Sequence, residues 1–370
     1  SATVGILILA TLIVDTILYE KWGFKLDAVC LSYLDNPSGI TDSLGWGYFL
    51  LAVAGFLLLI WGYVWVLWRI GPRPDGHSTR RSCFPTSHPV QRTLHSLGLL
   101  LVGALLFLGI RGGVGRSTAN VGMVYYSTDQ YHNHAAVNPI FSFFYSLLKE
   151  RDFSQQARYF SPDEANQVFA SLNYNTKSEL TPADSLLNTR RPNILLILME
   201  SCGGRVVGCT EGNTKVTPHL DSLAREGVFF SHCYANSFRT DRGTICTFSG
   251  YPSFPDASVM KMPAKSRVLP SIAGALRGVG YDTEFLYGGD KNFTNMNSYF
   301  LATGYNRVLG DVDFPVSMRK TSPWGVCDHL MFDQLRQNID RQPKNKPWFK
   351  TLLTLSSHEP WTVPYKRLDD

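Results

Sequence analysis

Several features that often reveal a protein's class are missing from this 370-residue chain. It contains no C-x-x-C pair, so a zinc site built from cysteine thiolates has little support. It has no internal repeat or low-complexity tract, which argues against a repeat architecture. Its charges nearly balance, with 35 Lys and Arg residues against 30 Asp and Glu, so nothing in the composition calls for nucleic-acid binding.

Three long apolar stretches occupy the first third of the chain. They are residues 2–18, 46–68 and 93–110. A helix of about 20 apolar residues crosses a bilayer, so we expect three membrane spans. For the first and third stretches, a buried helix of a soluble domain is the alternative. The chain opens inside an apolar run and without Met, so we expect its amino terminus to be cut away.

The connecting loops indicate how these spans are oriented. Segment 69–92 contains five arginines and a single acidic residue, whereas Lys21 and Lys25 are the only basic residues of segment 20–45. By the positive-inside rule, segment 69–92 is cytoplasmic, and the chain after Arg111 lies outside the cytoplasm. The pattern therefore predicts a multi-pass membrane protein with an exported second half.

Seven cysteines are distributed along the chain. They are Cys30, Cys83, Cys202, Cys209, Cys233, Cys246 and Cys327. Cys83 is expected to face the reducing cytoplasm, while the others would be exported and could pair, for instance Cys202 with Cys209. Their spacing does not determine the connectivity, and half-buried free thiols are the simpler alternative.

The segment 192–253 carries the first candidate site residue. Residues 193–199 form a short apolar run after a proline, which predicts a strand buried on both faces of a parallel sheet. Glu200 follows at the carboxyl end, where ligands of open α/β sheets bind, so it is a candidate metal ligand or general base. A helix is expected to start after Thr217, followed by a second buried strand at 228–234.

Thr240 precedes the apolar helical pattern of Ile245 and Phe248. A threonine at a helix start lies beside free backbone amides and the positive end of the helix dipole, and both suit an anion. A metal ion held by Glu200 would further lower the pKa of the hydroxyl and make it a nucleophile. The alternative is that Thr240 only caps the helix and that Glu200 is a solvated strand end.

Further strands and helices alternate in the second half of the chain. Strands are expected at 281–287, 306–309 and 348–355, and helices at 269–276 and 326–339. This alternation predicts a mixed, mostly parallel sheet covered by helices. His358 follows the last strand, where an imidazole can contact a phosphate oxygen or move a proton. Earlier in the chain, an amphipathic helix beginning at Pro139 is expected to lie on the membrane surface or to pack against the catalytic domain.

Together these motifs resemble a known superfamily. The strand ending at Glu200, the motif TPHLDSLAREGVFF at 217–230, and Thr240 before a helix that ends in SGYPS resemble the alkaline phosphatase and sulfatase superfamily. Within it, the chain is similar to the membrane-embedded lipoteichoic acid synthase group, which are phosphoglycerol transferases, from the membrane segments through LTLSSHEPW at 353–361. Sulfatases mature a Cys or Ser in a C/S-x-P-x-R context, and the absence of that motif favours the transferase branch.

The resemblance implies three regions and a chain truncated at both ends. Residues 1–113 would be an α-helical transmembrane region and residues 114–191 a juxtamembrane connector. Residues 192–370 would be an extracytoplasmic α/β alkaline phosphatase-like (sulfatase-like) catalytic domain. The family has five spans, so two would be missing upstream.

The resemblance also implies roles for single residues. Glu200 and Thr240 match two metal ligands of the family, and Thr240 matches its nucleophile. His358 matches a histidine that contacts the substrate phosphate, and Asp290 lies in the other substrate-contacting loop. The family's remaining ligands, an Asp and a His, would follow residue 370, so we expect the chain as it stands to bind metal poorly and to turn over nothing.

Two arginines and one loop bear on the substrate. Arg239 and Arg242 are near enough to Thr240 to neutralise phosphate charge, although a surface ion pair, with Asp241 for example, is the alternative. Lipoteichoic acid synthases carry a Trp-Asn-Arg motif where this chain has residues 293–297, without an arginine. The identity of the headgroup is therefore open.

The metal expected at this site is a divalent ion, manganese in the first place, with zinc or magnesium as alternatives, because one carboxylate and one hydroxyl do not discriminate between them. The sequence pair Asp328-His329 looks like the missing Asp and His. It begins a helix, however, and precedes His358, whereas the family pair follows that histidine. We do not expect it to bind metal.

The expected function is metal-dependent transfer of a phospholipid headgroup, of the phosphoglycerol type, to a glycan or lipid acceptor through a covalent phosphothreonine. The partners would be the bilayer, a phospholipid donor and that acceptor, at a bacterial cytoplasmic (inner) membrane. A phosphoethanolamine transferase or a phosphodiesterase on the same fold is the alternative. From another class, a membrane sensor or binding module that has lost turnover would share the fold.

Overall fold

The chain folds into two compact units. The computed structural model describes residues 2–31, 46–70, 89–115, 117–149, 159–171, 187–210, 212, 216–254 and 257–364. The first unit comprises Ser1–Leu148, Met260–Val268 and Asp290–Ala302, and the second comprises Lys149–Val259, Leu269–Gly289 and Thr303–Asp370. Two short segments of the predicted catalytic domain thus fold with the first unit. The division into 1–113, 114–191 and 192–370 stays a prediction.

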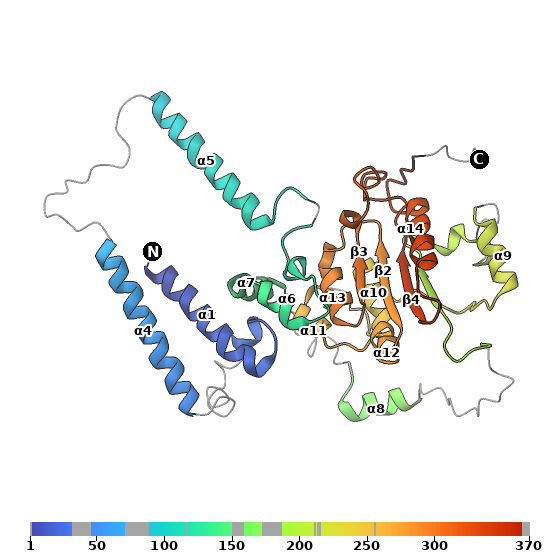
Figure 1. The fold of residues 1–370 in the computed structure, drawn as a ribbon, viewed down its shortest axis with the longest axis horizontal. Coiled ribbons are helices and arrows are strands. Elements are labelled where there is room, and N and C mark those ends of the chain that lie inside the picture. Colours follow the sequence, from blue (N-terminus) through green and yellow to red (C-terminus); the bar gives the residue numbers. More distant parts are fainter. Residues whose placement is uncertain are drawn as a thin grey trace. The chain divides into compact units, whose positions relative to one another are not determined.

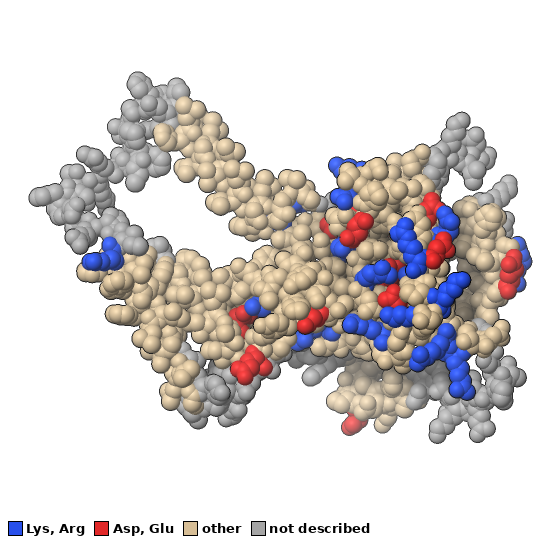
Figure 2. Space-filling model, viewed as in Figure 1, with Lys and Arg blue, Asp and Glu red and all other residues tan. Residues whose placement is uncertain are grey.

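Long apolar helices dominate the first unit (Figure 1). They are α1 (Ala2–Trp22), α4 (Trp46–Ile70) and α5 (Pro89–Arg111), and all three were predicted. Their surfaces carry few charged side chains (Figure 2). Among the described residues, Thr3–Glu20 and Thr93–Arg111 are long and apolar enough to cross a membrane. The apolar stretch found in α4, Val53–Arg69, is shorter, so the third span and a multi-pass arrangement stay predictions.

The rest of the first unit is built from short helices. They are η1 (Ala28–Leu31), η2 (Val121–Val124), α6 (Gln130–Ala136), α7 (Pro139–Lys149), α11 (Pro263–Ser266), η7 (Phe293–Asn295) and α13 (Met296–Ala302). Asn295 joins them, since its Oδ1 accepts the Gly122 N–H at 3.2 Å and its Nδ2 donates to Tyr145 Oη at 3.1 Å. One face of the amphipathic helix α7 is therefore packed, while Phe144 and Leu148 are 58% and 83% exposed. Its predicted contact with a membrane stays a prediction.

A parallel sheet forms the centre of the second unit. Its order is β1 (Ile194–Leu198), β4 (Trp348–Leu353), β2 (Asp282–Tyr287) and β3 (Arg307–Leu309), and all three pairings are parallel. All four strands were predicted. Leu353 pairs with Leu198 on one side and with Tyr287 on the other, so the carboxyl ends of three strands are level. The residues that follow these strands are brought to one edge of the sheet.

Helices cover both faces of this sheet (Figure 1). The helices of the second unit are α8 (Pro162–Ser171), η4 (Gly204–Val206), η5 (Gly208–Thr210), α9 (Pro218–Glu226), α10 (Thr240–Ser249), α12 (Ile272–Gly278), η8 (Asp311–Asp313) and α14 (Asp328–Asp340). Phe248 of α10 packs edge-on against Phe285 of β2. Leu286, the next residue of β2, packs with Met331 and Leu335 of α14. Because neighbouring strand residues point to opposite faces, the sheet lies between α10 and α14.

Two predictions about the first strands are wrong. Residues 228–234 form no strand, and Phe230 and Tyr234 are 72% and 79% exposed. An apolar run fits a strand only when another strand pairs with it, and none of the described strands does. β1 is not buried on both faces either, because Leu195 and Ile197 are 43% and 40% exposed. It alternates in burial and lies at the edge of the described sheet.

The cysteines that the structure describes are free thiols. They are Cys30, Cys202, Cys209, Cys233, Cys246 and Cys327. The suggested pair of Cys202 and Cys209 is therefore not formed, and Cys83 lies outside the described residues. Burial raises the pKa of the Cys202 and Cys246 thiols, which lowers their reactivity.

Candidate functional site

The structure brings Thr240 and Glu200 together. Thr240 is the first residue of α10, and its Oγ1 donates a hydrogen bond of 2.9 Å to Glu200 Oε2. Glu200 follows β1 at the carboxyl edge of the sheet. Both residues are half-buried, so the pair is held by the fold and still reachable from solvent. The first backbone N–H groups of α10 have no partner within the helix and suit an anion at this end.

Hydroxyl groups on both sides fix the position of Glu200. Its backbone N–H donates to Thr354 Oγ1 at 2.9 Å, and its carbonyl oxygen accepts from Ser357 Oγ at 2.7 Å. Ser201 Oγ donates to Glu200 Oε1 at 3.1 Å, so each carboxylate oxygen accepts one hydroxyl. Ser201, Thr354 and Ser357 were not among the predicted site residues. They are hydroxyl residues at or just beyond the ends of two predicted strands, and this position was the available signal.

His358 stands at the same edge of the sheet, five residues after the end of β4. Its Nδ1 lies 2.8 Å from the carbonyl oxygen of Glu359. A carbonyl oxygen only accepts, so Nδ1 carries the proton and Nε2 is the nitrogen left for a substrate. The ring packs against Trp324 with centroids 4.4 Å apart, and Trp324 Nε1 donates to the same carbonyl oxygen at 2.7 Å. Trp324 therefore helps to orient the imidazole.

The Asp328 carboxylate is engaged by the protein backbone. It accepts the N–H groups of Leu355 at 2.6 Å and Ser356 at 3.1 Å. The Asp328 N–H donates in turn to Ser356 Oγ at 2.9 Å. Burial raises the pKa of Asp328, and these hydrogen bonds oppose the shift. The residue ties the start of α14 to the end of β4, and the expectation that Asp328-His329 is not a metal pair stays a prediction.

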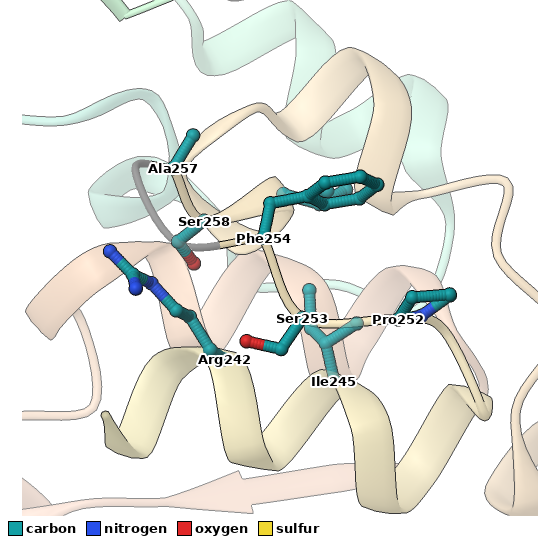
Figure 3. Close-up of a pocket in the computed structure, with 8 residues that line it drawn as sticks. Arg242, Ile245, Pro252, Ser253, Phe254, Ala257 and Ser258 are labelled. Atoms are coloured by element: carbon teal, nitrogen blue, oxygen red, sulfur yellow. The ribbon is translucent and has the colours of Figure 1, made fainter. Parts of the chain in front are cut away.

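The two arginines near Thr240 have different surroundings. Arg239 is exposed, and its guanidinium lies 5.6 Å from the ring centre of Phe238. Arg242 is half-buried and lines a small pocket together with described residues of 252–254 and 257–259 (Figure 3). Successive residues of an α-helix are rotated by about 100°, so the Arg242 side chain leaves α10 on roughly the opposite side from Thr240.

Asp290 belongs to the first unit, whereas Glu200, Thr240 and His358 belong to the second. Its Oδ1 accepts the Asn292 N–H at 2.9 Å, which holds a tight turn after β2. Its predicted contact with substrate therefore stays a prediction.

The site contains oxygen donors of the kind that a divalent metal ion needs. Glu200 and Thr240 offer a carboxylate and a hydroxyl side by side, and such hard oxygen donors suit magnesium or manganese. In the described part of the chain, no group of three or more His, Cys, Asp or Glu side chains could hold a metal. The two residues fit such an ion in kind, and their binding of it stays a prediction.

The described sheet is parallel, and at its carboxyl edge, where ligands of open α/β sheets bind, a hydroxyl is hydrogen-bonded to a carboxylate. Residues 192–369 match the sulfatase family model and form a domain of the sulfatase/alkaline phosphatase superfamily. Proteins of this superfamily generally depend on a divalent metal ion.

Two curated relatives show how far the similarity extends. "Lipoteichoic acid synthase-like YvgJ" of Bacillus subtilis (strain 168) is 21% identical over 207 residues, which cover 55% of this chain and 33% of that protein. "Lipoteichoic acid synthase" of Staphylococcus aureus (strain USA300) is 22% identical over 232 residues, which cover 60% of this chain and 34% of that protein. The chain thus spans about a third of the length of the curated relatives it matches.

Two solved structures are similar in part. A protein of the alkaline phosphatase superfamily from Vibrio parahaemolyticus has a TM-score of 0.46 and 31% identity, over 50% of this chain and 45% of that one. The lipooligosaccharide phosphoethanolamine transferase A of Neisseria meningitidis has a TM-score of 0.35 and 15% identity, over 96% of this chain and 58% of that one. Both scores are below 0.5, so the superfamily assignment rests on the sequence match.

Proposed function

We propose that this protein transfers a phospholipid headgroup to an extracytoplasmic acceptor, with Thr240 as the nucleophile. The hydrogen bond between Thr240 Oγ1 and Glu200 Oε2 carries this proposal, because it holds a hydroxyl at a helix start beside a base. The relatives named as lipoteichoic acid synthases support the reaction class. The acceptor would be a glycan or a lipid.

In the first step, Thr240 Oγ bonds to the donor phosphorus while the bond from phosphorus to the diacylglycerol oxygen breaks. The Thr240 proton passes to Glu200 Oε2, its hydrogen-bond acceptor, and the diacylglycerol oxygen takes up a proton from water. In the second step, an acceptor hydroxyl attacks the phosphothreonine and loses its proton to water. Thr240 leaves and recovers the proton held by Glu200. Free backbone amides at the start of α10 would stabilise the phosphate oxygens in both steps.

The remaining site residues would bind and orient the phosphate. As an imidazolium, His358 would donate its Nε2–H to a phosphate oxygen, with its ring oriented by Trp324 and by the Glu359 carbonyl. Arg239 is exposed and would attract the negative headgroup. Asp290 would contact the headgroup from the loop after β2. A divalent metal ion held by Glu200 and Thr240, manganese in the first place with zinc or magnesium as alternatives, would supply Lewis-acid stabilisation of the developing charge.

A membrane setting accords with this substrate. The apolar stretches Thr3–Glu20 and Thr93–Arg111 would anchor the protein in a bacterial cytoplasmic membrane, together with α4 as a third span. The arginine-rich segment 69–92 would face the cytoplasm, and the sulfatase-type domain would then lie on the outer side, next to its lipid donor.

The headgroup is the least determined part of the proposal. The turn that holds Asp290 leads into residues 293–297, which contain no arginine. This departure from the phosphoglycerol transferases makes phosphoethanolamine the second candidate headgroup.

Intact-mass measurement of the full-length protein tests both parts. Wild type and Thr240→Ala would be incubated with manganese and phosphatidylglycerol or phosphatidylethanolamine. We expect a mass addition in the wild type alone, and its size identifies phosphoglycerol or phosphoethanolamine. If neither lipid gives an adduct or is consumed, the transfer proposal fails and a binding module without turnover becomes the better interpretation.

A further inference from the structure

The loop after β2, residues 290–298, has a backbone that needs support from its surroundings. Thr294 and Asn295 have φ angles of 56° and 65°, in the left-handed region. That region is uncommon for residues other than glycine, and a β-branched residue such as threonine is strained there. Strained backbone persists where neighbouring contacts hold it, and it is often found at functional sites. The first half of the loop, 290–294, keeps exposed surface, and the second half is buried.

Side-chain amides of the buried half bind the predicted juxtamembrane connector. Asn295 Oδ1 accepts the N–H of Gly122 at 3.2 Å, and its Nδ2 donates to Tyr145 Oη at 3.1 Å. Asn297 Nδ2 donates to the carbonyl oxygen of Tyr125 at 2.9 Å. Asn295 and Asn297 are 0% and 3% exposed, so these hydrogen bonds are shielded from water. The connector therefore holds one of the two left-handed residues directly.

The connector backbone also lies directly against the loop. A Cβ added at Gly122 would lie 2.6 Å from Ser298 Oγ and 3.2 Å from Asn295 Oδ1, so only glycine fits there without displacing its neighbours. Asn120 Nδ2 donates to the carbonyl oxygen of Asn292 at 2.8 Å, which ties the first half of the loop to the connector as well. Loop and connector residues 120–145 belong to the same compact unit.

Hydrogen bonds to the connector thus occur before, at and after the left-handed residues, and they fix the backbone across the strained stretch. We propose that the juxtamembrane connector sets the conformation of the 290–298 loop, with Asn295 as the positioning residue, and so controls the affinity for the phosphate-ester headgroup. This role rests on the proposed function, in which Asp290 contacts the headgroup. Headgroup recognition then depends on the connector as well as on the sulfatase-type domain.

Two variants weaken this support in graded steps. Tyr145→Phe removes the hydroxyl that accepts from Asn295 and leaves the aromatic ring in α7. Asn295→Gly removes both side-chain hydrogen bonds, while glycine adopts a φ of 65° without strain. Tyr126→Phe makes the same chemical change as the first variant at a side chain that is 70% exposed, and it is the matched control. Thermal unfolding verifies that all three variants are folded.

Hydrogen exchange of the full-length protein, read by mass spectrometry, reports on the loop itself. Backbone amides of the loop donate to carbonyl oxygens within it, so they exchange when the loop opens. The loss of one hydrogen bond changes such an opening equilibrium about fivefold. We expect peptides covering 291–298 to exchange about fivefold faster in Tyr145→Phe and faster still in Asn295→Gly. Tyr126→Phe should exchange like the wild type.

Single-turnover adduct formation at Thr240 separates positioning from stability. The apparent affinity for the lipid falls with the fraction of loops in the binding conformation, so the lipid concentration that gives the half-maximal rate should rise about threefold in Tyr145→Phe. The rate at saturating lipid should stay at the wild-type value, because the hydrogen bond from Thr240 to Glu200 is untouched. A variant that was only less stable would lower the saturated rate at an unchanged half-maximal concentration.

A binding measurement decides the role of the connector even if no transfer is found. Glycerol phosphate and phosphoethanolamine serve as soluble probes, and at least one of them should slow exchange of the 290–298 loop in the wild type and in Thr240→Ala. Half-protection should need about threefold more of that probe in Tyr145→Phe than in Tyr126→Phe. Loop protection without any adduct at Thr240 would end the transfer proposal and leave the positioning role intact.

Three results would overturn the positioning role, whatever the transfer assay shows. One is wild-type exchange of the 290–298 loop in Asn295→Gly. Another is a wild-type loop that neither probe protects. The third is an equal concentration for half-protection in Tyr145→Phe and in Tyr126→Phe, which would mean that the connector stabilises the loop without affecting what it binds.

Discussion

At the scale of single residues, Ser201 combines two features that make it a positioning residue. Its backbone has a φ of 52°, in the left-handed region that disfavours a side chain, and its hydroxyl donates to Glu200 Oε1. A strained backbone of this kind costs on the order of 1–3 kcal/mol and is often found at functional sites. The strain turns the chain immediately after Glu200, and the hydroxyl then holds the carboxylate that receives Thr240.

Two substitutions separate these features. Ser201→Gly should relieve the strain and give a free energy of unfolding at least equal to that of Ser201→Ala. Both variants lose the hydrogen bond to Glu200, so both should slow headgroup transfer by roughly three- to tenfold. Denaturant unfolding and single-turnover adduct formation measure the two effects. Wild-type transfer in both variants would show that the hydroxyl does not position Glu200.

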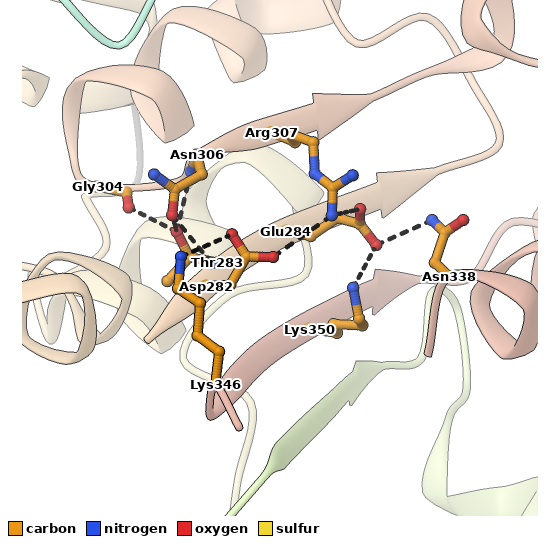
Figure 4. A network of polar contacts seen from close by, with 9 residues as sticks. All are labelled: Asp282, Thr283, Glu284, Gly304, Asn306, Arg307, Asn338, Lys346 and Lys350. Atoms are coloured by element: carbon orange, nitrogen blue, oxygen red, sulfur yellow. Dashed lines mark hydrogen bonds and ion pairs between the residues drawn. The ribbon is translucent and has the colours of Figure 1, made fainter. Parts of the chain in front are cut away.

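A buried charge pair lies in the middle of the sheet (Figure 4). Glu284 of β2 and Lys350 of β4 are both fully buried, and Lys350 Nζ lies 3.0 Å from Glu284 Oε1. Asn338 Nδ2 donates to the same oxygen at 2.9 Å, and half-exposed Arg307 lies 2.8 Å from Glu284 Oε2. The pair joins two central strands to each other and to α14.

Removing one partner should be costly. Lys350→Met removes the buried positive charge beside the Glu284 carboxylate, which then has, among the described residues, only Arg307 as a positively charged neighbour. Loss of one member of a buried ion pair costs about 3–5 kcal/mol of the free energy of unfolding. The double variant Glu284→Leu, Lys350→Met should recover most of that loss, because it buries no unpaired charge. Urea unfolding of wild type, both single variants and the double variant gives the coupling energy. A loss below about 1 kcal/mol for Lys350→Met would contradict the assignment.

At the scale of elements, α1 is tied to α6 by a buried histidine. His134 is 2% exposed, and its Nδ1 lies 3.1 Å from Tyr19 Oη. Burial lowers the pKa of His134 to about 4, and the positive charges of Arg267 and Lys25 act in the same direction. The ring is therefore neutral at pH 7 and accepts or donates at Nδ1 as the tautomer allows.

The depressed pKa predicts the pH dependence of stability. An unfolded histidine titrates near pH 6.5, so below that value the unfolded state binds a proton that the folded state rejects. The contribution of His134 is thus fully present above about pH 6.5 and is lost as the pH falls toward 4. Between pH 7 and 5 the wild type should lose about 2 kcal/mol more than His134→Gln. Thermal unfolding at both pH values measures this, and equal losses would refute it.

The elements that were predicted correctly are those that a local pattern of apolar and turn-forming residues is enough to identify. Strand 281–287 and helix 326–339 have apolar residues that alternate with turn signals, and both appear within two residues of the expected bounds. Residues 228–234 look like a buried strand by the same criteria, yet a strand also needs a neighbour, and the sequence does not show whether one exists. The prediction that β1 is buried on both faces was wrong for the same reason. Whether a strand lies at the centre or at the edge of a sheet depends on the tertiary structure, which a local pattern does not contain.

The candidate site was predictable in part. Glu200 and Thr240 could be expected to meet, since a strand end and a helix start at one sheet edge are brought together by the topology. The supporting hydroxyl of Ser357 and the stacking of Trp324 on His358 depend on side-chain contacts between distant segments, and no local pattern reports them. The side of α10 from which the Arg242 side chain leaves depends on the residue at which the helix begins. Sequence patterns locate a helix start only to within a few residues.

At the scale of the whole molecule, the proposed function requires the sulfatase-type domain and the arginine-rich segment 69–92 to lie on opposite sides of the membrane. Two native cysteines report on these sides. Cys83 lies in segment 69–92, and Cys233 is an exposed free thiol of the second unit. A membrane-impermeant maleimide added to intact spheroplasts should therefore label Cys233 and spare Cys83. After the membrane is opened, both should react.

The variants Cys233→Ser and Cys83→Ser assign each labelled peptide and serve as matched controls for the remaining thiols. The expected asymmetry follows from the five arginines of segment 69–92, because translocating that many positive charges is disfavoured. Labelling of Cys83 in intact spheroplasts would reverse the orientation and place Thr240 with the cytoplasm. An extracytoplasmic acceptor could then not be reached, and the transfer proposal would lose its substrate even if Thr240 were reactive.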